Sequence, residues 1–191
     1  MSATERLGYF HNAGYYALEG EDFRELFRLG KPADPQFLPL FAELVKYDRV
    51  ERLDTPELAR RSRENLSFWY ARRPSENPFQ RFTPVFVRTI EELKARDVAE
   101  YHAYAFATIR QFGSCFDLTA QYLRWLGAAL PGSIGSAAPH FEAISNSAKA
   151  MILKGARAVA GRKAVDFAPM LGDMARAWDD GVTALGSSLA E

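Results

Sequence analysis

From residue 55 onward, large apolar residues recur at three- and four-residue steps along most of the chain. This spacing places them on one face of an α-helix, and such a face is normally buried against other helices. About five segments of this kind follow one another between residues 53 and 191. The pattern therefore predicts a predominantly α protein, whose main body is an antiparallel bundle of about five helices.

Capping and breaking residues predict where these helices begin and end. We expect the first to begin with Thr55 as its N-cap, and the second to run from NPFQRF to about Arg96. Asp97 caps a long third stretch, in which Gly113 is the candidate point of division, and Asp166 begins the fifth helix. The expected buried face of the first helix consists of Leu58, Ser62, Leu66, Trp69 and Tyr70.

The first 52 residues differ, because strand-like and helix-like patterns alternate there. We expect a short strand around Leu7, a turn at Ala13-Gly14, a second strand to Leu18 and a helix over 19–29, while 37–45 is ambiguous. A lone hairpin is marginally stable in water. Either it lies against the helices as an appendage, or a segment encoded upstream completes its sheet, which is the reading we favour. The expected domains are 1–52 and 53–191.

Composition excludes several classes of function. Lys+Arg and Asp+Glu both number 24, so no net field attracts the chain to nucleic acid or to an anionic membrane. No signal peptide core and no apolar run of roughly 20 residues is present. The single Cys115 cannot form an internal disulfide and fits a reducing compartment. We expect a cytoplasmic protein that binds neither nucleic acid nor membrane.

Candidates for a nucleophile or a metal ligand are few. His102 precedes Cys115 by 13 residues, and at about 100° per residue a continuous helix would place the two on largely opposite faces. Because Phe112 and Phe116 flank Cys115, we expect its thiol to be packed among apolar side chains. The three histidines lack metal-ligand spacing, and the glycines of PGSIGS read as a helix connection. We expect no metal and no cofactor.

Arginine is dense between residues 60 and 88, where seven arginines face only two glutamates. Residues 1–59 have the opposite balance, with 11 acidic and 7 basic residues. The arginines either form a solvated face that offsets this acidic segment, which we favour, or bind a phosphate or an acidic partner. The candidate partner-binding residues are Arg60, Arg61, Arg63, Arg72 and Arg73.

Three stretches of the chain resemble one bacterial family, domain of unknown function 1839 (DUF1839): LGYFHNAGYYALEGEDF, FATIRQFGSCFDLTAQYLRWL and DFAPMLGDMARAWDDGV. The resemblance covers essentially the whole chain, but only the C-terminal part of a typical member. Members usually carry a further N-terminal region, similar to the cysteine-peptidase-like acyltransferase domain of butirosin biosynthesis protein H. They tend to be encoded near amino acid:carrier-protein ligases and acyl carrier proteins. The resemblance implies transfer of an aminoacyl group from a carrier-protein thioester to an amine.

The resemblance also implies that the N-terminal hairpin is the remnant of a papain-like α+β domain. In papain-like folds, an Asn or Asp at the end of a strand orients the catalytic histidine by a hydrogen bond. Asn12 matches this orienting residue, and His11 would flank the site because neighbouring strand residues point to opposite faces. The nucleophile and the base would be supplied from upstream, so this chain is expected to be inactive alone.

Two functions follow from these observations. The first is a cysteine-type acyltransferase, with an acyl carrier protein or a missing N-terminal segment as its partner. The second is a non-catalytic helical interaction module that docks an acidic carrier or partner protein through its arginine-rich face. An upstream segment encoding a cysteine helix and a histidine strand would favour the first.

Overall fold

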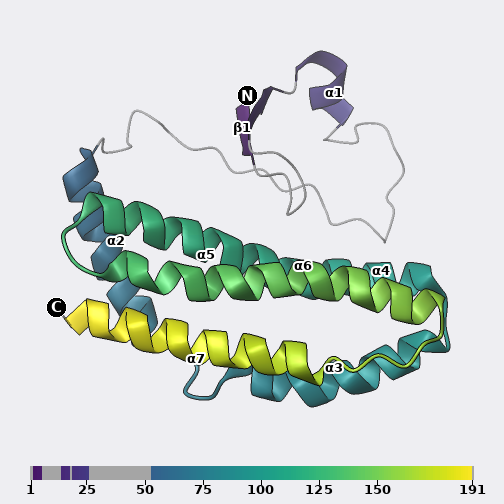
Figure 1. Ribbon diagram of the computed structural model, residues 1–191. Coiled ribbons are helices and arrows are strands. Elements are labelled where there is room, and N and C mark those ends of the chain that lie inside the picture. The colour runs from purple at the N-terminus through teal and green to yellow at the C-terminus, as the bar shows by residue number, and fades with distance from the viewer. Residues whose placement is uncertain (1, 6–13, 18, 26–52, 191) are drawn as a thin grey trace. The chain divides into compact units, whose positions relative to one another are not determined.

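The computed structural model describes residues 2–5, 14–17, 19–25 and 53–190 of the chain (Figure 1). The chain divides into two compact units, Met1–Arg52 and Leu53–Glu191. In the first unit, β1 (Ser2–Glu5) pairs with β2 (Gly14–Ala17) in an antiparallel ladder. β2 overlaps the expected second strand but begins one residue earlier than Tyr15, so that Gly14 belongs to the strand instead of the turn.

A short helix, α1 (Gly20–Glu25), follows β2 and overlaps the helix that the sequence predicts over 19–29. Gly20 has a φ of +57°, a left-handed conformation that glycine adopts at little cost. Several expectations lie outside the described residues. They are the strand around Leu7, the site residues His11 and Asn12, and the ambiguous segment 37–45.

The second unit is predominantly helical, as its apolar stripes predict. Residues 53–190 contain six α-helices and one short 3-10 helix. In Figure 1, α5, α6 and α7 lie side by side along their length, and α6 runs in the direction opposite to α5 and α7. The elements are α2 (Thr55–Tyr70), α3 (Pro78–Lys94), α4 (Val98–Ala107), α5 (Ile109–Ala129), the 3-10 helix (Ile134–Ala137), α6 (Ala138–Ala160) and α7 (Ala168–Ala190).

Short polar side chains begin most of these helices. The prediction for Asp97 is confirmed, because its carboxylate accepts a hydrogen bond from the Ala99 amide at 2.6 Å. The N-cap of α2 is Asp54 and not Thr55 as predicted, since the Asp54 carboxylate accepts from the Glu57 amide at 2.9 Å. A carboxylate satisfies the exposed amides of a first turn better than a hydroxyl, because it also complements the helix dipole.

Asn77 is the buried N-cap of α3 and also joins this helix to α7. Its side-chain oxygen accepts from the Phe79 amide at 3.0 Å, and its Nδ2 donates to the Ala175 carbonyl at 2.8 Å. One buried amide therefore satisfies a helix start and fixes the position of a distant helix.

The third helical stretch divides at Thr108, and the predicted division at Gly113 is wrong. Thr108 leaves the helical region with φ −123° and ψ −74°, and its hydroxyl donates to the Tyr104 carbonyl at 2.6 Å. A threonine hydroxyl bonded to the carbonyl four residues earlier bends a helix. Gly113 lies buried within α5. The division at Thr108 raises the helix number from about five to six.

The connection LPGSIGSAAP contains the 3-10 helix, whose Ile134 and Ala137 are buried. A Cβ built on Gly127 would lie only 2.8 Å from the backbone nitrogen of Gly135. These glycines thus permit a close backbone approach between α5 and the connection. The main core lies between the helices, and its largest fully buried side chains include Phe86, Tyr101, Leu123, Met151 and Leu171.

Candidate docking surface

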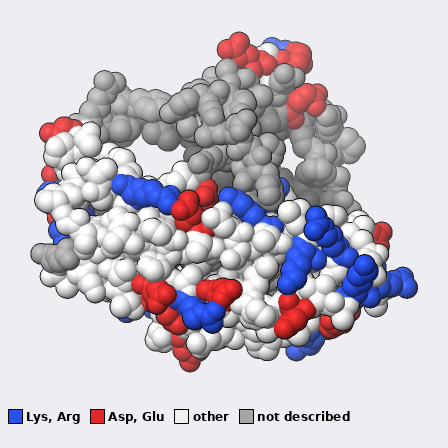
Figure 2. Space-filling model, in the orientation of Figure 1, with Lys and Arg blue, Asp and Glu red and all other residues white. Residues whose placement is uncertain are grey.

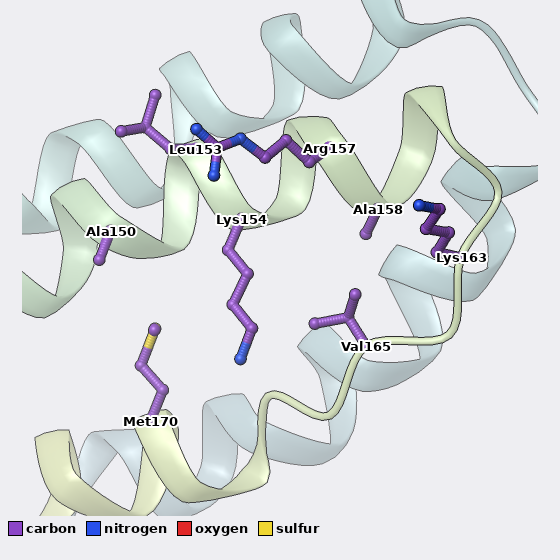
Figure 3. A pocket seen from close by; sticks show the side chains of 8 residues that line it. All are labelled: Ala150, Leu153, Lys154, Arg157, Ala158, Lys163, Val165 and Met170. Atoms are coloured by element: carbon purple, nitrogen blue, oxygen red, sulfur yellow. The ribbon is translucent and has the colours of Figure 1, made fainter.

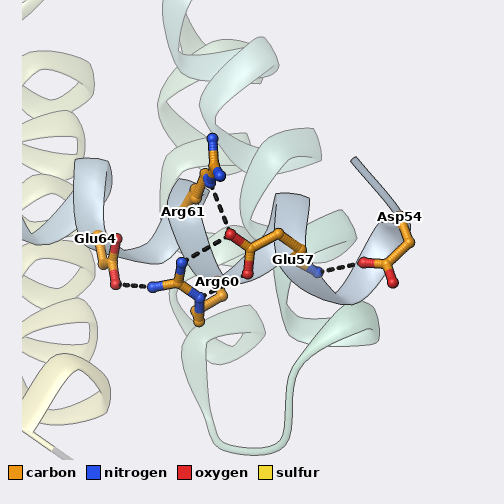
Figure 4. Close-up of polar contacts among 5 residues, drawn as sticks. All are labelled: Asp54, Glu57, Arg60, Arg61 and Glu64. Atoms are coloured by element: carbon orange, nitrogen blue, oxygen red, sulfur yellow. Dashed lines mark hydrogen bonds and ion pairs between the residues drawn. The ribbon is translucent and has the colours of Figure 1, made fainter. Parts of the chain in front are cut away.

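Two of the predicted partner-binding arginines form ion pairs along their own helix. Arg60 donates to both oxygens of Glu57 at 2.8 Å and also pairs with Glu64, and Arg61 Nε donates to Glu57 at 2.7 Å (Figure 4). The hydrogen bond from Arg60, and then that from Arg61, lowers the pKa of Glu57 from 4.5 to about 2. Glu57 in turn raises the pKa of Arg60 above its ordinary value. This end of α2 is therefore largely charge-compensated.

Two further predicted arginines lie in the turn that follows α2. Arg72 donates to the Phe68 carbonyl at 2.9 Å, and its guanidinium carbon lies 3.5 Å from the centroid of the Phe68 ring. Arg73 makes the same kind of contact with Tyr70, at 2.9 Å to the carbonyl and 3.9 Å to the ring. Arg63 is half-buried on the helix between these groups. Three of the five arginines thus lie on α2 and two in the turn that follows it, and the five do not form one continuous patch.

Large apolar side chains of α2 are exposed beside these arginines. Trp69 is 61% exposed and Phe68 48% exposed, with their rings 5.3 Å apart in an edge-to-face arrangement. Leu58 is 44% exposed on the same side. At about 100° per residue, these positions lie within one face of the helix. We call this surface the α2 outer face; it consists of Leu58, Arg61, Phe68 and Trp69 of α2 and of Arg72 in the turn that follows the helix.

The predicted buried face of α2 is wrong for Leu58 and Trp69. Hydrogen bonds to other helices set the rotation of α2, because Tyr70 donates to the Val182 carbonyl at 3.1 Å and Tyr122 donates to the Ser62 carbonyl at 2.9 Å. These contacts turn Ala59, Leu66 and Tyr70 towards the core and turn the adjacent Trp69 outward.

The other candidate groups do not come together into a catalytic arrangement. Cys115 is exposed on α5, so the prediction that it packs among apolar side chains is wrong; Phe112 and Phe116 turn inward without covering it. His102 lies on the neighbouring helix α4, with its ring against Tyr101. Among the residues that the structure describes, no group of three or more His, Cys, Asp or Glu side chains could hold a metal ion.

A second group of cations, which the density of arginines did not indicate, lies along the C-terminal half of α6 and in the turn after it. Residues 143–165 contain Lys149, Lys154, Arg157, Arg162 and Lys163 but no acidic residue. Arg60 and Arg61 of α2, by contrast, have glutamates three or four residues away, at the spacing that allows pairing on a helix. The signal that would have identified the α6 group is therefore the absence of nearby acids, not the density of cations.

The fold and its surface define a class of protein: a small unit with a two-stranded ladder, joined in sequence to a six-helix unit with exposed aromatic and arginine side chains. The chain belongs to the DUF1839 family, since the DUF1839 C-terminal domain matches residues 55–187 and the DUF1839 N-terminal domain matches residues 1–47. The predicted family is thus confirmed. Neither the curated proteins nor the solved structures contain a match to the chain. Within the described ranges, no helix has the length and apolar character needed to cross a membrane.

Proposed function

We propose that the helical unit is a protein-docking module that binds an acidic partner through the α2 outer face. The observation that carries this proposal is the exposure of Trp69 beside Phe68, with Arg72 stacked on the Phe68 ring. Tryptophan and arginine are the residue types most enriched among the side chains that dominate binding energy at interfaces. An exposed aromatic pair of this size has no role in the core of its own helix bundle.

The charge of α2 favours an acidic partner. Residues 55–73 contain five arginines and two glutamates. Arg72 is held against its own helix by the Phe68 carbonyl and ring, so little side-chain entropy is lost when it binds a carboxylate. An acyl carrier protein is a partner of this chemistry.

The experiment measures binding of the full chain to a purified acidic acyl carrier protein by biolayer interferometry. We expect Trp69→Ser to weaken binding at least about 30-fold, which corresponds to a loss of about 2 kcal/mol at a dominant interface residue. Arg72→Glu should weaken binding and reduce its dependence on salt, because it replaces one of several positive charges at the surface. The matched control is Arg88→Glu, which changes an exposed arginine of α3 whose nearest carboxylate, that of Glu92, is 3.9 Å away.

Arg72 is a sharper test than Arg60, because Arg60→Glu would also break the ion pairs that stabilise the start of α2. Wild-type affinity in both Trp69→Ser and Arg72→Glu, or no binding by the wild-type chain, would contradict the proposal. Weakening by Arg88→Glu equal to that by Arg72→Glu would also contradict it, since the effect would then follow net charge alone.

The acyl transfer implied by the resemblance to butirosin biosynthesis protein H stays a prediction, as does a papain-like origin of the N-terminal unit. Both depend on Asn12 as orienting residue and His11 beside it, and these lie outside the described residues. A docking module for an acidic carrier is compatible with that reaction but does not require it.

A further inference from the structure

An apolar pocket lies between the C-terminal part of α6 and the start of α7. Its volume is about 470 Å³, within the range of pockets that bind small molecules. Its accessible lining is almost entirely apolar, and Leu153, Val165 and Met170 form what we call the pocket wall. The wall is contributed by α6, by the connection 161–167 and by α7.

Three cations also line this apolar pocket: Lys154, Arg157 and Lys163, which we call the pocket cations. No acidic residue lines it, and within residues 53–190 none of the three forms an ion pair with a carboxylate. Figure 2 shows blue side chains gathered at the end of the bundle at which α6 leads into α7. An apolar pocket with uncompensated positive charge is complementary to a ligand with an apolar body and a negative group.

Lys154 is oriented into the pocket by neutral partners. Its Nζ donates to the backbone carbonyl of Asp166 at 2.9 Å and lies 5.3 Å from the centroid of the Phe167 ring. Figure 3 shows the side chain extending from α6 towards α7, with Val165 and Met170 facing it. The carboxylate of Asp166 is engaged by the Ala168 amide at 2.9 Å. The ammonium group is therefore positioned without being neutralised, because a carbonyl and a ring leave its charge in place.

The backbone turn after α6 places Lys163 at the pocket, although it requires an unfavourable backbone conformation at Arg162. Arg162 has a φ of 48°, in the left-handed region where glycine is the usual residue after a helix. The Lys163 amide donates to the Ala158 carbonyl at 3.0 Å and the Arg162 amide to Val159 at 3.2 Å, which is the hydrogen-bond pattern of a Schellman cap. Arg162 thus occupies the left-handed position where a glycine would relieve strain, and Lys163 follows it at the end of the cap.

We propose that this pocket binds an anionic amphiphile with a single alkyl chain. The alkyl chain packs against the pocket wall, and the pocket cations bind the carboxylate or phosphate head group. The helix dipole explains a cation in the last turn of α6, which is the place of Arg157. It does not explain Lys154, which lies farther from the helix end and points into the pocket, or the apolar volume beside it.

The test is isothermal titration calorimetry of the full chain with octanoate, decanoate and decyl phosphate, each below its micelle concentration. We expect affinity to rise about fourfold for each methylene that enters the pocket. The comparison of decanoate with decyl phosphate identifies the head group, and binding of either one supports the proposal. Neutral decyl maltoside, which carries the same alkyl chain, should bind at least about tenfold more weakly than the better anion.

Two kinds of variant separate the pocket from non-specific binding. Lys154→Met keeps the side-chain stem but removes the charge. It should lower the affinity for the more tightly bound anion about tenfold or more. Ala150→Phe fills the pocket from an exposed position of α6 and should abolish binding. Arg88→Gln, on α3 and outside the pocket, should bind like wild type, and circular dichroism verifies that each variant is folded. The proposal would be overturned if the wild type and all variants bound the anions with equal affinity, or if the wild type bound decyl maltoside as tightly as the anions. It would also be overturned if the wild type bound none of these ligands.

Discussion

At the scale of single residues, Glu57 is a group whose protonation the fold clearly changes. It accepts hydrogen bonds from Arg60 and Arg61, and its pKa falls from 4.5 to about 2. A carboxylate with a lowered pKa contributes stability above its unfolded value of 4.5 and loses that contribution as pH falls towards 2. The ion pairs of Glu57 with Arg60 and Arg61 therefore persist down to about pH 2 to 3, below the range in which ordinary carboxylates are protonated.

The prediction is that Arg60→Gln raises the pKa of Glu57 towards 4.5, because Arg60 is the largest cause of the lowered value. Arg61→Gln should raise it less. Carboxyl ¹³C NMR titration of the full chain measures both. Arg88→Gln, on another helix, should leave the pKa of Glu57 unchanged. If Arg60→Gln leaves it unchanged as well, the pairing in Figure 4 does not exist in solution.

At the scale of helices, the contact between α4 and α6 depends on a glycine. Tyr101 of α4 is fully buried, and its hydroxyl donates to the Ile152 carbonyl of α6 at 2.9 Å. A Cβ built on Gly155 would lie 2.1 Å from the Tyr101 oxygen. No rotation of a buried ring relieves an overlap of this size without moving a helix.

We therefore expect Gly155→Ala to lower the free energy of unfolding by roughly 1–3 kcal/mol, the usual cost of overpacking. Gly172→Ala in α7 is the matched control, since its Cβ would meet only the flexible Arg176 side chain at 3.6 Å. That change should stabilise the chain by about 0.5–1 kcal/mol through the higher helix propensity of alanine. Urea unfolding followed by circular dichroism measures both, and effects of the same sign would disprove this account of the contact.

At the scale of helices, the spacing of apolar residues predicts some features of the fold and not others. The helices and the cap at Asp97 follow from local sequence, because apolar spacing and capping act within a few residues. The rotation of α2 does not, since it depends on hydrogen bonds from Tyr70 to Val182 and from Tyr122 to Ser62, across 112 and 60 residues. The division was predicted at Gly113 because glycine is a common helix breaker. The helix instead bends at Thr108, whose hydroxyl donates a hydrogen bond to a backbone carbonyl.

For the candidate surfaces, the count of arginines singled out α2, but it did not show that pairing with Glu57 and Glu64 removes much of the charge of this helix. The pocket between α6 and α7 could not be predicted from the sequence, because it forms only where Met170 of α7 faces Lys154 of α6. Only its charge was visible in the sequence, as residues 143–165 without an acid.

At the scale of the whole molecule, the core that the described residues form lies within one of the two units. Its buried apolar residues run from Ala59 to Leu185, and all belong to the unit Leu53–Glu191. A hydrophobic core is the dominant source of folding free energy, and a unit of this size buries enough apolar surface to be stable alone. The DUF1839 C-terminal domain matches the same region, over residues 55–187.

The last prediction is that residues 53–191, expressed as a separate polypeptide, fold cooperatively. We expect a thermal midpoint within about 3 °C of the transition that the helices show in the full chain, the shift that about 1 kcal/mol produces in a domain of this length. Circular dichroism and calorimetry follow the two polypeptides under the same conditions. A fragment without a cooperative transition would show that residues 1–52 supply stability that the helical core lacks. The two units would then not be independently stable parts of the chain.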